Sequence, residues 1–528
     1  MNRKMGFMSV ALAIGLVGGA AQAAPSTDLV KIESGKLQGV VRDGVVAFKG
    51  VPFAAPPVGD LRWKPPQPAA AWSGVRSAAE YGHDCAQKPF PSDAAPLGTE
   101  PSEDCLVLNV WRPAEASKTK LPVMVWIYGG GFVNGGSSPS VYAGDQFAKQ
   151  GVVLVSPNYR LGRFGYFAHP ALSKENPKGP LGNYGFMDQI AALEWVQRNI
   201  AAFGGDPDNV TIFGESAGGF SVHTLMTTPK AKGLFHKAIV QSGGGRGNMT
   251  PGRKVGGETP GGPPSGESVG LAFAKSVGVE GQDAAALAAL RKLPAEAVIA
   301  NMNMMTMFNP TYAGPMIDGQ IVVDEPERIY RAGGGANVPL IVGANSMDIG
   351  FSMARTIDEV YAPFGAERRA AAQAVYDPKG TGDVRAVGTL VASDKMMVEP
   401  ARFAAKAWSA HDRPVYAYRF SYVADSMRKE WPGAPHATDI PYVFDTVQEK
   451  YGAALTPADA KAAQQANAYW AAFAKTGDPN GGGRPAWPLY EPKADKILDF
   501  TNEGPVAMAD PWKARLDLAE QAADAPKP

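Results

Sequence analysis

The 528-residue sequence has little of several features that would define a protein class. It has two cysteines, and neither charge is in surplus, because Lys and Arg together number 51 and Asp and Glu together number 51. This balance argues against a nucleic-acid-binding protein, which needs a basic surplus or stripe to meet phosphates. Beyond the N-terminal segment no run reaches the roughly 18 consecutive apolar residues of a membrane-spanning helix, so we expect no transmembrane anchor. No Cys/His cluster has metal-ligand spacing, and we expect no metal and no organic cofactor.

The N-terminus has the pattern of a secretory signal peptide. Arg3 and Lys4 supply positive charge, an apolar run of about fifteen residues follows, and an Ala-Gln-Ala cleavage site ends at Ala23. We therefore predict that residues 1–23 are removed and that the mature protein is secreted or periplasmic, with one domain over residues 24–528. A membrane anchor is the alternative, but the apolar run is short for one.

The two cysteines are Cys85 and Cys105. In an exported protein each is the other's natural intramolecular partner, so a disulfide between them is predicted. Two free buried thiols are the alternative, which export disfavours.

Strand-like and helix-like segments alternate along the chain. Such alternation implies a parallel or mixed sheet with helices on both faces, an α/β fold. The clearest strand candidates are 121–129, 152–160, 210–213, 237–243 and 338–345, and the clearest helix candidates are 187–203 and 217–226.

A Gly-x-Ser-x-Gly pattern at residues 214–218 places Ser216 where a strand ends and a helix begins. Flanking glycines leave room for the sharp turn that exposes a nucleophilic serine. The pattern alone is a weak signal, since it recurs at residues 266–270 around Ser268. That second match follows a Gly/Pro-rich stretch, which cannot be a central strand, so Ser268 is expected near a helix start. Ser216 is therefore the nucleophile candidate.

A glycine run follows the strand candidate at 121–129 and could hold an oxyanion. Attack on a carbonyl builds negative charge on oxygen, which backbone N–H groups stabilise where side chains leave them accessible. The N–H groups of Gly130 and Gly131, with that of Ala217 after the serine, would make a three-donor oxyanion hole. A flexible glycine turn is the alternative.

Several long segments, in order, resemble the type-B carboxylesterase family, the α/β-hydrolases that include the cholinesterases. The resemblance covers nearly all of the mature chain and implies an α/β-hydrolase fold with a large, mostly parallel sheet and a small-molecule ester substrate. The segments are FKGVPFAAPPVGDLRW (48–63), SEDCLVLNVW (102–111), NYRLGRFGYF (158–167), residues 182–219, GAPHATDIPYVF (433–444) and WAAFAKTGDPN (470–480).

The resemblance implies that His436, in GAPHATDIPYVF, is the catalytic base that a serine nucleophile needs. Its late position fits the chain order Ser, Asp or Glu, His of this fold. The histidines near the elbow, His223 and His236, are expected to have packing roles. The remaining three, which carry no strong signal, are His83, His169 and His411.

The acid that orients His436 is predicted to be Asp348, in the segment GANSMDIGF (343–351). Most family members have Glu followed by Gly here, whereas this chain has Asp348 followed by Ile349. The side chain is one methylene shorter, so the backbone or the histidine must lie slightly closer. The rival acids are Asp439, Asp318 and Glu215.

This reading predicts a serine carboxylesterase that forms an acyl-enzyme and loses activity as pH falls through the titration of His436, near neutral or below. Phe90 is the only aromatic residue between the cysteines, where cholinesterases carry a Trp, so a choline ester is disfavoured. Cholinesterases also carry a Trp soon after the segment that matches residues 241–243. This chain lacks it, so we expect more room for the acyl group of the substrate. Alternatives are an interfacial lipase, a hydrolase of a specialised ester such as a toxin or xenobiotic, and a non-catalytic binding protein.

Two further segments have no assigned function. Residues 243–266 are rich in Gly and Pro and are expected to lack regular structure, as a linker or a mobile rim. Residues 301–308, NMNMMTMF, are rich in Met. Core filling is the favoured interpretation, and an adaptable pocket wall is the alternative.

Overall fold

A computed structural model gives the fold of residues 27–90, 95–247 and 252–525. The predicted signal peptide, residues 1–23, lies outside the described residues. The largest sheet has the strand order β1-β2-β3-β5-β7-β6-β10-β11-β12-β13-β14-β15, with β4 beside β2. Its strands, with the separate pair β8 and β9, are β1 Thr27–Ile32, β2 Gly35–Arg42, β3 Val45–Pro52, β4 Val75–Ser77, β5 Val107–Pro113, β6 Leu121–Ile127, β7 Val153–Pro157, β8 Tyr166–Phe167, β9 Gly182–Asn183, β10 Gly205–Glu215, β11 Lys237–Gln241, β12 Leu340–Asn345, β13 Val415–Phe420, β14 Lys496–Thr501 and β15 Gly504–Ala509.

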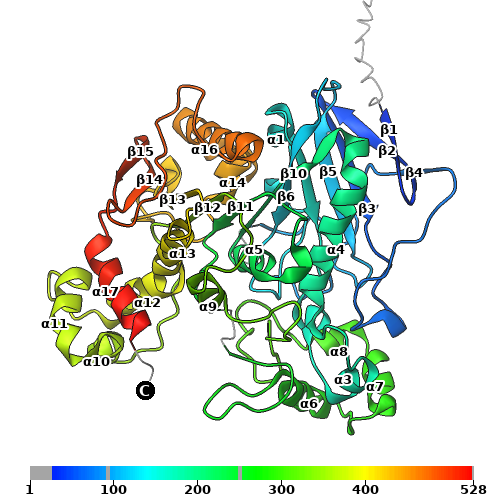
Figure 1. The fold of residues 1–528 in the computed structure, drawn as a ribbon, viewed down its shortest axis with the longest axis horizontal. Coiled ribbons are helices and arrows are strands. Elements are labelled where there is room, and N and C mark those ends of the chain that lie inside the picture. The colour runs from blue at the N-terminus through cyan, green and yellow to red at the C-terminus, as the bar shows by residue number, and fades with distance from the viewer. Residues whose placement is uncertain (1–26, 91–94, 248–251, 526–528) are drawn as a thin grey trace, which may run out of the picture.

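The centre of the sheet is parallel and its ends are antiparallel. Strands β7, β6, β10, β11, β12, β13 and β14 pair in parallel. The N-terminal strands β1, β2, β3 and β5 and the β14–β15 pair are antiparallel, whereas the short β4 pairs in parallel with β2. Figure 1 shows the N-terminal strands at one end of the sheet and β15 at the other. The predicted mixed sheet is therefore confirmed.

Helices cover both faces of this sheet. Helix α5 packs on β10 and β11, while α16 packs on β6 and β10; Figure 1 shows α4 and α5 on one side of the sheet and α1 and α16 on the other. The α-helices are α1 Asp145–Lys149, α2 Gly162–Gly165, α3 Pro170–Glu175, α4 Tyr184–Asn199, α5 Ala217–Thr227, α6 Gly266–Ser276, α7 Ala284–Arg291, α8 Ala295–Ile299, α9 Pro326–Arg331, α10 Ile357–Tyr361, α11 Gly365–Tyr376, α12 Val384–Ser393, α13 Glu399–Ser409, α14 Ile440–Val443, α15 Val447–Tyr451, α16 Pro457–Thr476 and α17 Lys513–Asp524.

Local sequence explains the elements that frame the centre of the sheet. All five residues of β7 and all six of β12 are buried, as expected of strands covered on both faces. Helix α16 begins at a capping box, in which Thr456 and Asp459 exchange hydrogen bonds, and ends at Gly477 with φ 80°. Among the described helices, none combines the length and the apolarity needed to cross a membrane.

The predicted disulfide is present between Cys85 and Cys105. It closes a loop beside the strand edge where the parallel strands end: Asp84, next to Cys85, accepts a hydrogen bond from the N–H of Ser138 at 3.3 Å.

The carboxyl ends of β10, β11 and β12 meet at one edge of the sheet, because neighbouring parallel strands run the same way. Ser216 follows β10, Ser242 follows β11 and Asp348 lies just beyond β12. A parallel bridge between Met347 and Pro435 brings the segment before His436 to the same edge. The topology thus gathers segments from distant parts of the sequence at one place.

Candidate functional site

Ser216 occupies a sharp turn between β10 and α5. Its φ and ψ are 55° and −123°, a conformation that non-glycine residues rarely adopt and that costs about 1–3 kcal/mol. A Cβ on Gly218 would lie 1.9 Å from the carbonyl oxygen of Ile127, and one on Gly214 would lie 2.6 Å from that oxygen. Both glycines are therefore required, and Ser216 is only half-buried between buried neighbours.

The second Gly-x-Ser-x-Gly match has a different setting. Ser268 lies in the first turn of α6, where the side chain of Ser265 accepts a hydrogen bond from its N–H. The Ser268 hydroxyl donates to Glu258 at 2.5 Å. The expectation of a helix start is confirmed, and Ser268 lacks the strand-to-helix turn of Ser216.

A carboxylate and an imidazole form a close pair beside the elbow. The distance between His436 Nδ1 and Asp348 Oδ1 is 2.6 Å. Asp348 Oδ2 accepts hydrogen bonds from the hydroxyl of Ser242 at 2.6 Å and from the N–H of Asn345 at 2.9 Å. These contacts fix the carboxylate so that Nδ1 carries the proton, which leaves Nε2 of His436 as the basic nitrogen.

Two of the rival acids have other partners. Asp439 accepts hydrogen bonds from the side-chain amides of Gln241 at 2.6 Å and Asn345 at 3.2 Å. Asp318 accepts from Asn183 and from the N–H groups that follow it in its own turn. Asp439 therefore supports the loop that carries His436, and Asp318 holds a turn.

The third rival, Glu215, lies beside the other ring nitrogen of the histidine, with its Oε1 3.2 Å from His436 Nε2. Burial alone would lower the pKa of His436, but the charges of Glu215 and Asp348 and the Asp348 hydrogen bond raise it to about 9. Burial opposes ionisation of Asp348, yet the imidazolium and its hydrogen bonds hold the pKa of Asp348 below its usual value. The pKa of His436 therefore lies above the range expected from the sequence, which was near neutral or below.

The glycine run lies directly beside Ser216. A Cβ on Gly129 would lie 3.0 Å from Cβ of Ser216 and 2.8 Å from Oε2 of Glu215. Gly130 and Gly131 have φ values of 104° and 63°, which favour glycine. The turn is closed by a hydrogen bond of 2.9 Å from the N–H of Asn134 to the carbonyl of Gly130. The structure thus brings the glycine run and the elbow together.

The remaining histidines have structural contacts. His223 is buried, pairs with the Tyr330 hydroxyl at 2.7 Å, and has a pKa lowered to about 4 by burial. His236 accepts a hydrogen bond from the N–H of Val210 at 3.1 Å. The packing roles expected for these two residues are confirmed.

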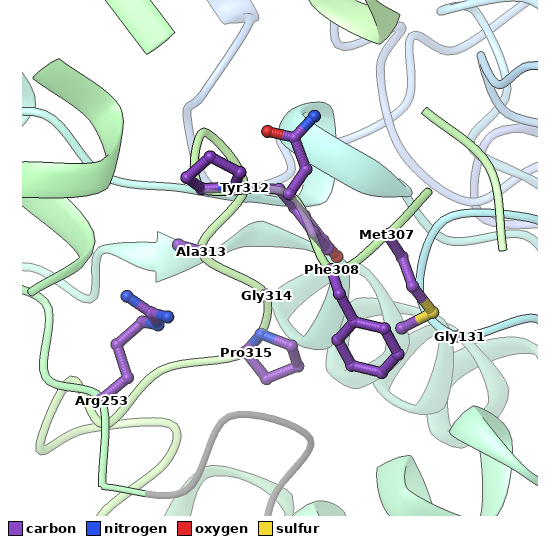
Figure 2. A pocket seen from close by; sticks show the side chains of 10 residues that line it. Gly131, Arg253, Met307, Phe308, Tyr312, Ala313, Gly314 and Pro315 are labelled. Atoms are coloured by element: carbon purple, nitrogen blue, oxygen red, sulfur yellow. The ribbon is translucent and has the colours of Figure 1, made fainter. Parts of the chain in front are cut away.

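A pocket of about 340 Å³ opens beside the glycine run (Figure 2). Its lining is mostly apolar and comes from Gly131, Arg253, Met307, Phe308, Asn309, Pro310, Tyr312, Ala313, Gly314 and Pro315. No group of three or more His, Cys, Asp or Glu side chains that could hold a metal ion occurs in the described part of the chain.

The Met-rich segment forms a wall of this pocket. Met302 is buried, but Met305 and Phe308 are 75% and 71% exposed, and Met307 lines the cavity. Core filling, the favoured interpretation, holds for Met302 and in part for Met304 and Met307, which pack against the core, but it is wrong for Met305 and Phe308. The sequence pattern misled because Met serves equally in a core and at an adaptable surface.

Buried Arg163 fixes the wall to the body of the protein, and sequence reasoning missed it. Its guanidinium donates to the carbonyl of Thr311 at 2.8 Å and to that of Val298 at 3.0 Å. The Tyr312 hydroxyl also donates to the carbonyl of Phe132, and the N–H of Met304 donates to Asn134. The pocket wall is thereby attached to the glycine run.

Ser242, Asn345 and Arg253 were also missed. The positions of Ser242 and Asn345 at the carboxyl ends of neighbouring strands were the only sequence signal available for them. Arg253 lies in the segment 243–266, which was left open as a linker or mobile rim. Within that segment, the backbone of Lys254 forms a parallel β-bridge with Ile317.

A serine on a strand-turn-helix elbow, beside a glycine run and a His–Asp pair at the carboxyl edge of a parallel sheet, defines an α/β-hydrolase. Comparison with protein-family models identifies the family within this fold. The carboxylesterase family model matches residues 26–378 and 366–517, and the chain belongs to that family.

Three curated relatives cover most of the chain. The chain is 35% identical over 494 residues to fumonisin B1 esterase from Sphingopyxis macrogoltabida, covering 89% of this chain and 86% of the relative. It is 36% identical over 504 residues to para-nitrobenzyl esterase from Bacillus subtilis, covering 90% and 95%. It is 34% identical over 485 residues to carboxylesterase 1C from Rattus norvegicus, covering 85% and 84%. The chain is a carboxylic ester hydrolase with the α/β-hydrolase fold predicted from its sequence.

Proposed function

We propose that the protein is an exported serine carboxylesterase that works through an acyl-enzyme, with Ser216 as nucleophile, His436 as general base and Asp348 as the acid that orients it. The observation that carries this is the 2.6 Å contact between His436 Nδ1 and Asp348 Oδ1 at the edge of the sheet where Ser216 stands on its elbow. The Cys85–Cys105 disulfide supports export, because disulfides persist in oxidising compartments.

In the first half of the reaction, Nε2 of His436 takes the hydroxyl proton as Ser216 Oγ attacks the ester carbonyl carbon. The carbonyl oxygen becomes an oxyanion, which the N–H groups of Gly130, Gly131 and Ala217 stabilise. Protonated His436 then gives its proton to the alcohol oxygen as the carbon–oxygen bond breaks. The alcohol leaves, and the acyl group stays on Ser216.

In the second half, water replaces the alcohol. His436 Nε2 takes a proton from the water as its oxygen attacks the acyl carbon, and the same N–H groups hold the second oxyanion. His436 then protonates Ser216 Oγ, and the carboxylic acid departs. Asp348 stays ionised throughout, because the hydrogen bonds from Ser242 and Asn345 stabilise its charge.

The test is burst-phase hydrolysis of p-nitrophenyl esters from acetate to octanoate, with Ser216→Ala and the matched control Ser268→Ala. We expect Ser216→Ala to abolish the burst and to lower turnover by about 10³-fold or more, and Ser268→Ala to leave both unchanged. A burst that survives in Ser216→Ala would overturn the assignment of the nucleophile.

An interfacial lipase is a second candidate, favoured by exposed apolar side chains around the pocket. Besides the pocket residue Phe308, Phe351 is 56% exposed, and the ring centroids of these two residues lie 5.8 Å apart. A jump in rate when triglyceride passes from monomers to an emulsion would support the lipase. The similarity to fumonisin B1 esterase supports a third candidate, hydrolysis of a specialised ester.

A further inference from the structure

The pocket beside the glycine run contains one charged side chain in a mostly apolar lining. Figure 2 shows Arg253 on one side of the pocket and Gly131 with Met307 on the other. Arg253 is 9% exposed. A buried guanidinium is costly unless an opposite charge or hydrogen-bond acceptors compensate it, so its presence in an apolar lining requires an explanation.

The hydrogen bonds of Arg253 are incomplete within the described part of the chain. Nη1 donates to the carbonyl oxygen of Pro264, and buried Nε has no hydrogen-bond partner. Glu258 acts on Arg253 electrostatically, but it is exposed and accepts hydrogen bonds from the hydroxyls of Ser265 and Ser268. A guanidinium has five N–H donors; Nε is covered by the protein, so the terminal N–H groups that do not bond to Pro264 are the donors that Arg253 keeps for a ligand.

The backbone of Arg253 is nevertheless held in place. Its carbonyl accepts a hydrogen bond of 2.7 Å from the N–H of Ile317, and the N–H of Val255 donates to the carbonyl of Ile317 at 3.1 Å. The side chain therefore extends from a backbone position fixed on both sides, as a specificity determinant requires.

We propose that Arg253 is a specificity-determining residue that binds a carboxylate on the substrate, so that the preferred substrates are esters whose acid or alcohol half carries a second, ionised carboxyl group. A planar guanidinium with free N–H groups matches a carboxylate in a bidentate pair. The inference rests on the proposed function, because Gly131, a proposed oxyanion-hole residue, lines the same pocket as Arg253.

The size and charge of the pocket agree with this substrate class. Its volume of about 340 Å³ lies at the lower end of small-molecule sites, roughly 300–1,000 Å³, and suits a compact ester. The lining is mostly apolar, and a pair between guanidinium and carboxylate is stronger there than in water. The same charge repels a quaternary ammonium, in agreement with the expectation that a choline ester is disfavoured.

Two matched pairs of esters test the proposal on the two halves of the substrate. For the acid half, mono-p-nitrophenyl adipate is compared with its methyl ester; for the alcohol half, 4-butanoyloxybenzoate is compared with its methyl ester. We expect kcat/KM of the wild-type enzyme to be higher for the charged member of at least one pair. No preference for the charged member in either pair overturns the proposal without any variant.

The variant Arg253→Gln then tests whether Arg253 is the cause of the preference for the charged ester. We expect it to lower kcat/KM for the preferred charged ester about tenfold or more, mainly through KM, and to leave the methyl ester nearly unchanged. Arg253→Lys, which keeps the charge but not the fork, should fall between. The matched control is Lys254→Gln, which removes the charge of the exposed neighbouring side chain and should change neither ester. Equal losses for both esters in Arg253→Gln would indicate a structural role and overturn the proposal.

Ser216→Ala separates this inference from the proposed function. Burst hydrolysis of the methyl esters by Ser216→Ala would overturn the proposed nucleophile. An inactive Ser216→Ala together with an unchanged preference in Arg253→Gln would overturn the role of Arg253 alone.

Discussion

The two sides of the site are built differently. On the catalytic side, the carboxylate of Asp348 is buried and lies at the end of the central sheet, and Ser216 stands on a turn that permits only glycine at its tightest points. On the opposite side, residues 301–315 contain neither helix nor strand, and they expose Met305 and Phe308. The proposed reactive groups therefore lie just beyond strand ends or, for His436, in a turn bridged to that edge, whereas the pocket wall is made of loops.

This difference in construction predicts which quantity a mutation on each side should change. Strand ends and the turn bridged to them hold the proposed catalytic groups, so a change there should lower kcat. The pocket wall depends on a few side-chain hydrogen bonds, chiefly those of Arg163, so a change there should alter KM and stability. Four substitutions test this comparison.

The largest effect is expected for Asp348→Asn. An amide cannot accept the proton of Nδ1 in the same way and favours the wrong tautomer of His436, so kcat should fall about 10⁴-fold with little change in KM. Steady-state kinetics with p-nitrophenyl butyrate measures this. Asp439→Asn is the matched control, because Asp439 bonds to Gln241 and Asn345. A larger loss in Asp439→Asn than in Asp348→Asn would reverse the assignment of the acid.

Arg163→Met should destabilise the pocket wall and leave the chemical step nearly unchanged. It leaves the buried carbonyls of Val298 and Thr311 without their donor, which should lower the free energy of unfolding by about 3 kcal/mol and raise KM several-fold with kcat nearly kept. Urea unfolding and Michaelis kinetics measure the two effects. Arg198→Gln is the control, since its exposed pair with Glu33 contributes at most about 1 kcal/mol. A loss confined to kcat would contradict the comparison.

The same division separates what the sequence predicted from what it missed. Ser216 was found because its signal is local: an apolar strand, a glycine-flanked serine and a helix follow one another within a few residues. His436 and Asp348 carry little local signal and were reached through the family resemblance and the chain order. The alternation of strands and helices predicted the sheet, since burial on both faces produces long apolar runs.

The pocket wall was not predictable in this way. Arg163 and Thr311 are 148 residues apart, and nothing in either segment indicates their contact. Arg253 lies in a Gly/Pro-rich stretch whose composition indicates only the absence of regular structure. The exposure of Met305 depends on what packs against it, and amino-acid type alone does not determine that.

Glu215→Gln should move the pH dependence. The base must be neutral, so kcat/KM should rise with pH through the raised pKa of His436, with a midpoint above 6.5. Removing the negative charge of Glu215 destabilises the imidazolium, so the midpoint should move down by about one pH unit. A pH–rate profile measures the midpoint. A midpoint that stays in place in Glu215→Gln, or moves upward, would contradict the electrostatic role of Glu215.

The smallest effect is expected for Phe308→Ala on the exposed wall. Because the ring is 71% exposed and touches Phe351 edge-on, stability should change by no more than about 1 kcal/mol. Hydrolysis of p-nitrophenyl acetate should be unchanged, since its acyl group has little apolar surface to bury against the ring, whereas KM for the octanoate should rise about threefold. Leu489→Ala, at another exposed apolar residue, is the control and should change neither ester. If hydrolysis of the acetate falls as much as that of the octanoate, the wall contributes to positioning of the reacting atoms, and the division between a catalytic side at the strand ends and a binding side on loops fails. If wild-type rates instead collapse for every chain longer than acetyl, the expected roomier acyl side is wrong and the wall limits the substrate.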